Sequence, residues 1–495
     1  MYLHNINNSF NYELEKLCRI FLPFEKIVFT NEPKNSDIYA ETKLKKEKEV
    51  TYLSAELCMH NKKSVHKASI DNSVNNYLRE CEILLATQLF KCFSDITGYK
   101  SEWGILTGVR PAKLYSSLCS ANGKEAADRE FAEKFLVSSE KISLCAETYK
   151  TEQEIIKNSA ADSFSLYISI PFCPTRCSYC SFVSHSVDKS HKLIPEYVDK
   201  LIEEIKYTAQ IANLNGLKLK TVYIGGGTPT TLEAGDLSKI MQTVKENFDL
   251  SNPCEYTVEA GRPDTITEEK LRAILFGGAT RISINPQTMS DDVLQRIGRR
   301  HTTEQTVSAY LLARKVGFNN INMDLIAGLP GDTFDNFCDT IEKVIALNPE
   351  NVTVHSLSFK RAANLSTDAE NEYISGTETA KMVRYATARL TETGIFPYYM
   401  YRQSKTVGNL ENVGYAKKGF EGLYNVYIMD ETHTILACGA SGVTKLREPY
   451  GNYIERIFNF KYPYEYISNF KEIINRKENI NIFYKTRSNG YGFSK

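Results

Sequence analysis

The chain has 495 residues, which is too long for one hydrophobic core of ordinary size, so two or three domains are expected. Its 60 basic and 60 acidic residues balance, which argues against a nucleic acid or an anionic membrane surface as the main partner. No run approaches the roughly 18 apolar residues of a membrane span, and the start lacks the pattern of a secretion signal. We expect a cytoplasmic monomer, and abundant unpaired cysteine suits that reducing compartment.

Residues 1–158 carry no catalytic signature, and we predict that they form an accessory α+β domain of unknown role. Hydrophobic periodicity predicts a helix over 11–22, a strand over 49–57 and a long helix over 72–97, with mostly helical structure over 133–156.

The segment S-E-W-G-I-L-T-G-V-R-P-A-K-L at 101–114 holds Trp103, the only tryptophan. The simpler interpretation is a turn that packs Trp103 and starts a helix at Pro111. The alternative is that Arg110 and Lys113 bind an anionic substrate.

From residue 161 to 358, a short β-branched or aromatic run is repeatedly followed by a helical segment, which makes six strand-helix units. Strands that alternate with helices imply a parallel sheet with right-handed crossovers. Six units suit an incomplete barrel better than a closed eightfold one, although a doubly wound sheet shares the local pattern. The predicted strands are 165–170, 221–225, 255–260, 281–286, 320–326 and 351–357, and the predicted helices are 195–213, 234–247, 268–276, 303–316 and 334–347.

Three cysteines, Cys173, Cys177 and Cys180, follow the first predicted strand in a C-x3-C-x2-C spacing. Disulfides fit poorly, because three is an odd number and nothing suggests secretion. One possibility is zinc with His185 as the fourth ligand. The other is an iron-sulfur cube, in which three thiolates would leave one iron open.

The other predicted strands also end at residues that can bind a ligand, and in parallel α/β proteins ligands bind at that edge of the sheet. Each residue also has a structural interpretation: the glycines could shape a turn, the polar side chains could cap helices, and Arg299, further along, could be a solvated charge. Together they offer donors and acceptors for carboxylate, ammonium and hydroxyl groups. The residues at the strand ends are the G-G-G-T-P-T run at 225–230, Glu259, Gln287, Asp324 and His355.

Several motifs together resemble the oxygen-independent coproporphyrinogen III oxidase family of radical S-adenosylmethionine (SAM) proteins: Y-I-S-I-P-F-C, Y-I-G-G-G-T-P-T, V-E-A, I-N-P-Q, I-G-R-R-H and D-L-I-A-G-L-P. The segments W-G-I-L-T-G-V-R-P, H-S-L-S-F-K-R-A and Y-R-Q-S-K-T-V-G-N-L-E-N-V-G-Y-A resemble its HemZ subgroup of coproporphyrinogen dehydrogenases. The resemblance implies an incomplete (β/α)6 TIM-like barrel at 159–360, flanked by the N-terminal domain and by a C-terminal α+β extension at 361–495 on the substrate side.

The resemblance also implies the cofactors and their residues. Cys173, Cys177 and Cys180 would bind a [4Fe-4S] cluster whose open iron chelates SAM. No side-chain acid or base is required, so no catalytic residue is predicted. The SAM contacts implied are Tyr167, Tyr179, Gly226, Gly227, Thr228, Glu259, Gln287, Arg299 and Asp324.

The implied reaction is oxygen-independent oxidative decarboxylation of two propionates of coproporphyrinogen III, with an electron donor such as a flavodoxin or a ferredoxin. The chain departs from the family at Ser169, where a His is usual, and at Phe182, where a fourth cysteine is usual. Related members carry haem as chaperones or open the haem ring, and these functions are the alternatives. Lys360, Arg361, Tyr399, Tyr401 and Arg402 are candidate contacts for a tetrapyrrole with four carboxylates.

Overall fold

The computed structural model describes residues 1–32, 36–180, 185–251, 255–358, 375–403 and 405–488. The chain packs as two compact units. Unit 1 comprises Met1–Tyr149, Ser375–Ala380 and Met400–Asn412, and unit 2 comprises Lys150–Ile374, Lys381–Tyr399 and Val413–Lys495. The division into three domains at 158 and 360 stays a prediction. Within the described ranges, no helix is long and apolar enough to cross a membrane.

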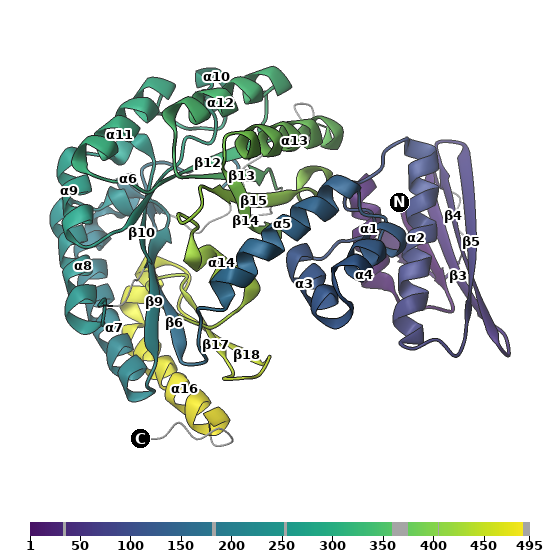
Figure 1. Cartoon of the computed structure of the whole chain (residues 1–495), viewed down its shortest axis with the longest axis horizontal. Helices are drawn as coiled ribbons and strands as arrows, with labels where there is room; N and C mark the ends of the chain where they lie inside the picture. The colour runs from purple at the N-terminus through teal and green to yellow at the C-terminus, as the bar shows by residue number, and fades with distance from the viewer. Residues whose placement is uncertain (33–35, 181–184, 252–254, 359–374, 404, 489–495) are drawn as a thin grey trace. The chain divides into compact units, whose positions relative to one another are not determined.

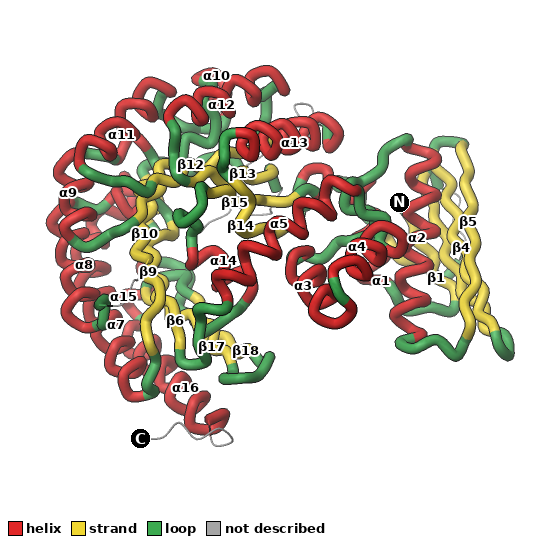
Figure 2. The backbone as a smooth tube through the Cα atoms, in the orientation of Figure 1, coloured by secondary structure: helices red, strands yellow, loops and turns green. Residues whose placement is uncertain are grey.

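Unit 1 contains a five-stranded sheet in the order β2-β1-β3-β4-β5, and helix α2 lies along β4 and β5 (Figure 2). Strand β4 buries alternate residues, as expected for a sheet with one face against a helix. The strands are β1 (Tyr2–Ile6), β2 (Val28–Thr30), β3 (Ile38–Lys46), β4 (Val50–Met59) and β5 (Lys62–Asp71). The helices are α1 (Asn11–Phe21), α2 (Tyr77–Thr97), α3 (Pro111–Asn122), α4 (Lys124–Arg129) and the single turn η1 (Glu130–Lys134), and α5 (Ser139–Ile156) leads into unit 2.

Most N-terminal sequence predictions are confirmed, but the long helix starts later than expected. The Asn72 amide donates to the carbonyl oxygens of Glu47 and Lys48 at 2.8 and 3.3 Å, and the Asp71 carboxylate accepts from the Ser73 backbone at 2.8 Å. These side-chain bonds favour a turn over a first helical turn. The helix therefore begins at Tyr77 rather than at residue 72.

Unit 2 is built on an eleven-stranded sheet in the order β14-β15-β13-β12-β11-β10-β9-β6-β16-β17-β18. Six neighbouring strands, from β13 to β6 in that order, are parallel, which confirms the incomplete barrel (Figure 1). These strands are β6 (Ser163–Ile170), β9 (Lys218–Gly226), β10 (Glu255–Gly261), β11 (Arg281–Ile284), β12 (Ile321–Ala327) and β13 (Asn351–Ser356).

Helices cover the outer face of these strands, as the ribbon shows (Figure 1). Four of the predicted helices match at both ends, namely α8 (Ala234–Asn247), α9 (Glu268–Phe276), α11 (Thr303–Val316) and α12 (Phe334–Leu347), and the fifth is α7 (Ile194–Leu214). Shorter elements between the strands are β7 (Phe172–Cys173), β8 (His185–Ser186), α6 (Val187–Ser190), the turns η2 (His191–Leu193), η3 (Pro229–Thr231) and η4 (Pro263–Thr265), and α10 (Asp291–Arg296).

The C-terminal extension adds strands to both ends of the barrel sheet. Strand β16 pairs parallel with β6, whereas β15 pairs antiparallel with β13. The elements are α13 (Gly376–Glu392), β14 (Phe396–Arg402), η6 (Val407–Asn409), β15 (Glu411–Ala416), α14 (Leu423–Asp430), β16 (Thr434–Cys438), β17 (Val443–Arg447), β18 (Ile454–Phe458), α15 (Pro463–Ser468) and α16 (Phe470–Ser488).

A buried polar network fastens α16 to the barrel. Lys477 on α16 forms an ion pair at 3.1 Å with Glu204 on α7, and both side chains are at most 2% exposed. The Glu204 carboxylate also accepts from the Gly439 backbone at 2.7 Å and from the Tyr466 hydroxyl at 2.6 Å. Helix α16 is therefore an integral part of unit 2, because its removal would take away the Lys477 cation that pairs with the buried Glu204 carboxylate.

Candidate cofactor site

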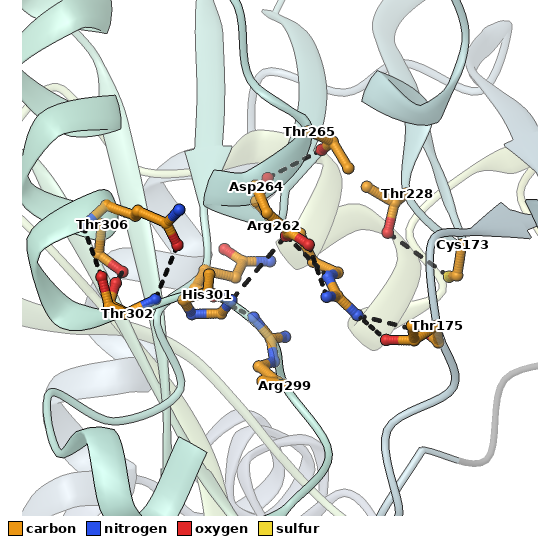
Figure 3. Close-up of polar contacts among 12 residues, drawn as sticks. Cys173, Thr175, Thr228, Arg262, Asp264, Thr265, Arg299, His301, Thr302 and Thr306 are labelled. Carbon is orange, nitrogen blue, oxygen red and sulfur yellow. Dashed lines mark hydrogen bonds and ion pairs between the residues drawn. The ribbon is translucent and has the colours of Figure 1, made fainter. Parts of the chain in front are cut away.

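The first cysteine lies where the backbone of the first two strands approaches closely. Cys173 ends β7, and Thr228 lies just after β9. The Cys173 Sγ atom is 3.5 Å from the Thr228 Oγ1 atom (Figure 3). A Cβ atom at Gly227 would lie 2.5 Å from the Phe172 carbonyl oxygen and 3.0 Å from Cys173 Sγ. Only glycine fits at 227, so this position shapes the turn and lets its backbone approach residues 173–180, which we call the cysteine segment.

The second half of the cysteine segment is held by the residues after α10. The Ser178 backbone donates to the Ile297 carbonyl oxygen at 3.1 Å. Arg299 is buried and donates to the Tyr179 hydroxyl from Nη2 at 3.1 Å and to the Asn285 carbonyl oxygen from Nη1 at 2.7 Å. Burial raises the pKa of Tyr179 above its ordinary value although Arg299 opposes the shift, so the phenol stays protonated.

Tyr167 belongs to a stack of three tyrosines at the inner face of the barrel. Its ring is 6.3 Å from that of Tyr223 and 6.2 Å from that of Tyr424, and the last two rings are 4.5 Å apart. The Tyr223 hydroxyl donates to the Glu259 carboxylate. The stack thus supports Glu259 from the side of β6 and β9.

Glu259 has the properties of a carboxylate prepared for a cationic partner. Burial raises its pKa to about 7, Asp324 adds to the shift, and the hydrogen bond from Tyr223 opposes it. An ammonium group nearby would replace the lost solvation and stabilise the ionised form.

Asp324 lies on the next strand but one and stays ionised. Burial would raise its pKa, but His355 and Asn322 outweigh this effect and hold the pKa below its usual value. The Asn322 amide donates to Asp324 Oδ1 at 2.7 Å, and His355 Nε2 is 3.9 Å from Asp324 Oδ2. Two carboxylates with different proton affinities therefore share this edge of the sheet.

Gln287, in the segment after β11, bonds to β12 through its backbone. Its N–H donates to the Asp324 carbonyl oxygen at 2.9 Å, and its own carbonyl oxygen accepts from Ile326 at 2.9 Å. A φ of 69° at Gln287 makes this possible, and the preceding strand β11 ends at Ile284 rather than at 286 as predicted.

The predicted SAM contacts fall into two neighbourhoods in the described structure. Gly227 and Thr228 contact Cys173, and Tyr179 contacts Arg299. The other neighbourhood contains Tyr167, Glu259, Gln287 and Asp324. The tyrosine stack joins Tyr167 to Glu259, Asp324 raises the pKa of Glu259, and the backbone of Gln287 bonds to β12. Gly226, with a φ of 113°, ends β9 between them.

Sequence reasoning missed Tyr223, Tyr424 and Arg262. Tyr223 could have been found, because it lies two residues before Gly225 on the same strand and therefore points to the same face. Tyr424 gave no signal, since its helix α14 comes from the extension. Arg262 follows Glu259 closely in V-E-A-G-R-P-D-T, but no local pattern relates it to the cysteines.

Three thiols on one short segment are ligands of the kind that an iron-sulfur cube binds. Among the described residues, no group of three or more His, Cys, Asp or Glu side chains gathers tightly enough to hold a metal ion. A single zinc needs its ligands to converge on one point, whereas each thiolate of a cube binds a different iron. Phe182 lies outside the described residues, as does the side chain of His185, so neither contributes to this comparison.

The candidate substrate contacts in the extension differ in access. Arg402 is 3% exposed and donates from Nη2 to the Leu106 carbonyl oxygen at 2.8 Å and to Asn409 Oδ1 at 2.5 Å. Tyr399 is buried against Gly414. We therefore assign these two residues structural roles, and Lys360 and Arg361 lie outside the described residues.

Comparisons with known proteins identify relatives of the chain. A family model described as the radical SAM superfamily matches residues 167–344. The chain is 39% identical over 386 residues to the oxygen-independent coproporphyrinogen-III oxidase-like protein HemZ of Bacillus subtilis (strain 168), with 77% of each chain covered. It is also 32% identical over 313 residues to the heme chaperone HemW of the same organism, covering 61% of this chain and 77% of that protein.

A solved structure shows the same fold. Coproporphyrinogen III oxidase (HemN) from Escherichia coli, described as a radical SAM enzyme, superposes with a TM-score of 0.52 at 22% identity. The match covers 66% of this chain and 73% of that one. At this identity the likeness concerns the fold alone.

Proposed function

We propose that the chain oxidises coproporphyrinogen III. The premise is its family, because the chain belongs to the radical SAM family of oxygen-independent coproporphyrinogen-III oxidase-like proteins. The cofactors of this family are a [4Fe-4S] cluster and SAM. In the proposed reaction, two propionate side chains each lose a hydrogen atom, an electron and carbon dioxide, which gives the two vinyl groups of protoporphyrinogen IX.

We assign the cluster to Cys173, Cys177 and Cys180. The observation that carries the assignment is the position of the segment at the carboxyl edge of the parallel strands, against a glycine that no larger residue could replace. When bound, the reduced cluster and SAM supply a carbon-centred radical that can remove hydrogen from an unactivated carbon.

The protein's own residues bind and orient SAM in this proposal. The Glu259 carboxylate pairs with the ammonium group, with Gly226 and Gly227 beside it at the end of β9. The Gly227 and Thr228 N–H groups already donate to the Ile170 and Phe172 carbonyl oxygens at 2.8 and 2.7 Å, so neither is assigned to the carboxylate of SAM. Asp324, ionised at neutral pH, accepts hydrogen bonds from ribose hydroxyls. Arg299 and Tyr179 line the side of the cysteine segment.

The rest of the chain orients the tetrapyrrole and excludes water and oxygen. No side chain is assigned as an acid or a base, because the cofactors carry the reaction. The electron that reduces the cluster comes from an external donor, for which a flavodoxin or a ferredoxin is suitable, and a separate acceptor takes the electron that each propionate loses.

The second candidate function is haem transfer, which the likeness to the heme chaperone HemW favours. One contact speaks against it. Ser169, at the position where relatives were expected to carry histidine, is 3% exposed, and a Cβ atom at Gly226 would lie 3.0 Å from its Oγ atom. A buried hydroxyl in close packing is a poor ligand for haem iron.

Anaerobic incubation of reconstituted protein with SAM, a reductant and coproporphyrinogen III distinguishes the two functions. Protoporphyrinogen IX together with 5'-deoxyadenosine is the result that we expect. Tight binding of haem without turnover of coproporphyrinogen would support the chaperone and refute the proposed oxidation.

A further inference from the structure

Arg262 is placed rigidly at the edge of the barrel by its own backbone. It follows β10 and precedes the turn η4, and its carbonyl oxygen accepts from the Thr265 N–H at 3.0 Å and from Thr265 Oγ1 at 2.8 Å. The preceding Gly261, with a φ of 63°, accepts from the Asn285 N–H at 2.8 Å. The arginine therefore projects from a frame that β10 and β11 hold together.

The Arg262 guanidinium is only 3% exposed and is oriented by a carboxylate on its own turn. Nε and Nη2 donate to the two oxygens of Asp264 at 3.0 and 2.7 Å. His301, 4.0 Å from Asp264, does not compete as a cation, because burial and the neighbouring Arg299 lower its pKa to about 4. This two-point contact fixes the plane of the guanidinium (Figure 3).

The remaining nitrogen of Arg262 contacts the cysteine segment. Nη1 donates to Thr175 Oγ1 at 2.6 Å and to the Thr175 carbonyl oxygen at 3.4 Å (Figure 3). Thr175 is the middle residue of the three between Cys173 and Cys177. The next spacing, between Cys177 and Cys180, is held separately by Ile297 and Arg299.

We propose that Arg262 is a positioning residue that fixes the first spacing of the cysteine segment and so sets the arrangement in which the thiols receive a cluster. The inference rests on the proposed cluster ligands. Holding Thr175 in place before iron arrives lowers the entropic cost of ordering the ligands, as preorganisation does at other binding sites.

The test compares Thr175→Val, which removes the accepting hydroxyl, with Thr175→Ser, which keeps it. Arg262→Met and the double variant Arg262→Met/Thr175→Val complete a mutant cycle. Arg272→Met is the control, because Arg272 also donates to a nearby carboxylate through Nε and Nη2, to Glu268 Oε1 at 2.9 and 2.6 Å, but on the exposed surface of α9. All variants are full-length and reconstituted without oxygen.

The first measurement is the rate at which a ferrous chelator removes the cluster. The loss is monitored through the absorption of the cluster at about 400 nm. Thr175→Val should lose the cluster about tenfold faster, which corresponds to about 1.4 kcal/mol. Thr175→Ser and Arg272→Met should behave like the unchanged protein, and the double variant should not exceed Arg262→Met. A Thr175→Val rate within twofold of the unchanged protein, or effects that multiply in the double variant, would overturn the inference.

The second measurement needs no cluster. In the iron-free protein, alkylation of Cys173, Cys177 and Cys180 is followed by peptide mass spectrometry. It should be several-fold faster in Thr175→Val, while the midpoint of thermal unfolding stays unchanged. Equal alkylation rates would refute the positioning role even if no iron binds at all. Retention of a full cluster in Cys177→Ala would instead refute the ligand assignment, so the two failures are distinguishable.

Discussion

Replacement of Lys141 by Met should destabilise unit 1 strongly, because it removes the buried cation that pairs with two carboxylates. Lys141 Nζ lies 2.5 Å from Glu411 Oε1 and 3.1 Å from Glu102 Oε2, and the Lys141 and Glu411 side chains are 4% and 0% exposed. The Trp103 indole N–H also donates to Glu411 at 2.6 Å. Burial alone would lower the pKa of Lys141, but the two carboxylates outweigh it and raise the pKa.

The expected cost follows from the geometry. Breaking a buried pair by removing one partner costs about 3–5 kcal/mol, and the retained Trp103 bond places this change towards the lower end. With an m value of about 2 kcal/mol/M in urea, the midpoint should fall by about 1.5 M. Trp103 is the only tryptophan of the chain and lies in unit 1, so its fluorescence follows this unit.

Two controls make the measurement specific. Lys124→Met removes a surface pair with Asp128 at 2.6 Å, where Lys124 is 65% exposed, and should cost about 0.5 kcal/mol or less. Glu411→Gln combined with Lys141→Met removes both charges and should recover part of the loss. A cost below about 1 kcal/mol for Lys141→Met alone would refute the reasoning, because the pair would then not be desolvated.

Three further predictions concern unit 2. Glu259→Gln should weaken SAM binding at least about tenfold in equilibrium dialysis while iron content stays unchanged, because it removes one charge-assisted contact; equal affinity would remove Glu259 from the site. The pKa of Glu259 is about 7, and its protonated form cannot pair with an ammonium group, so SAM affinity should fall as the pH drops below about 7. Tyr223→Phe removes the hydrogen bond that lowers this pKa and should therefore move the midpoint of the pH dependence to higher pH. A midpoint that stays in place would contradict the role of Tyr223. His433 lies between Ser159 and Ser165, and burial lowers its pKa to about 3. The unfolded state therefore takes up the proton first, and the free energy of unfolding should fall by up to about 1.4 kcal/mol per pH unit as the pH drops from about 6.5 towards 3. His433→Gln should flatten this dependence, and an unchanged slope would show that another group causes it.

The sequence predicted the central elements well because their signals are local. Helices such as α8 and α12 match at both ends, since their hydrophobic periodicity coincides with favourable ends, and α12 has the cap Thr333. Strand β11 ended early because the backbone turns at Gln287, whose positive φ is set by its bonds to β12. A partner from another strand cannot be read from a local pattern.

The parts that escaped prediction depend on contacts between distant segments. Strand β16 pairs with β6 although the paired residues Thr434 and Phe164 are separated by the rest of the central domain and much of the extension, and no local pattern encodes that pairing. Tyr424 stacks on Tyr223 only because α14 is brought to the barrel by the extension. The same holds for Arg262 and Thr175, whose contact joins the ends of strands that are not neighbours in the sheet.

The central claim is that three thiols of one short segment hold an iron-sulfur cube that meets SAM. Iron, sulfide and zinc measured in anaerobically purified protein, beside the same measurement on Cys177→Ala, test it most directly. The account predicts about four irons and four sulfides per chain in the unchanged protein and loss of the absorption at about 400 nm in the variant. Stoichiometric zinc without iron, or an intact cluster in the variant, would contradict it.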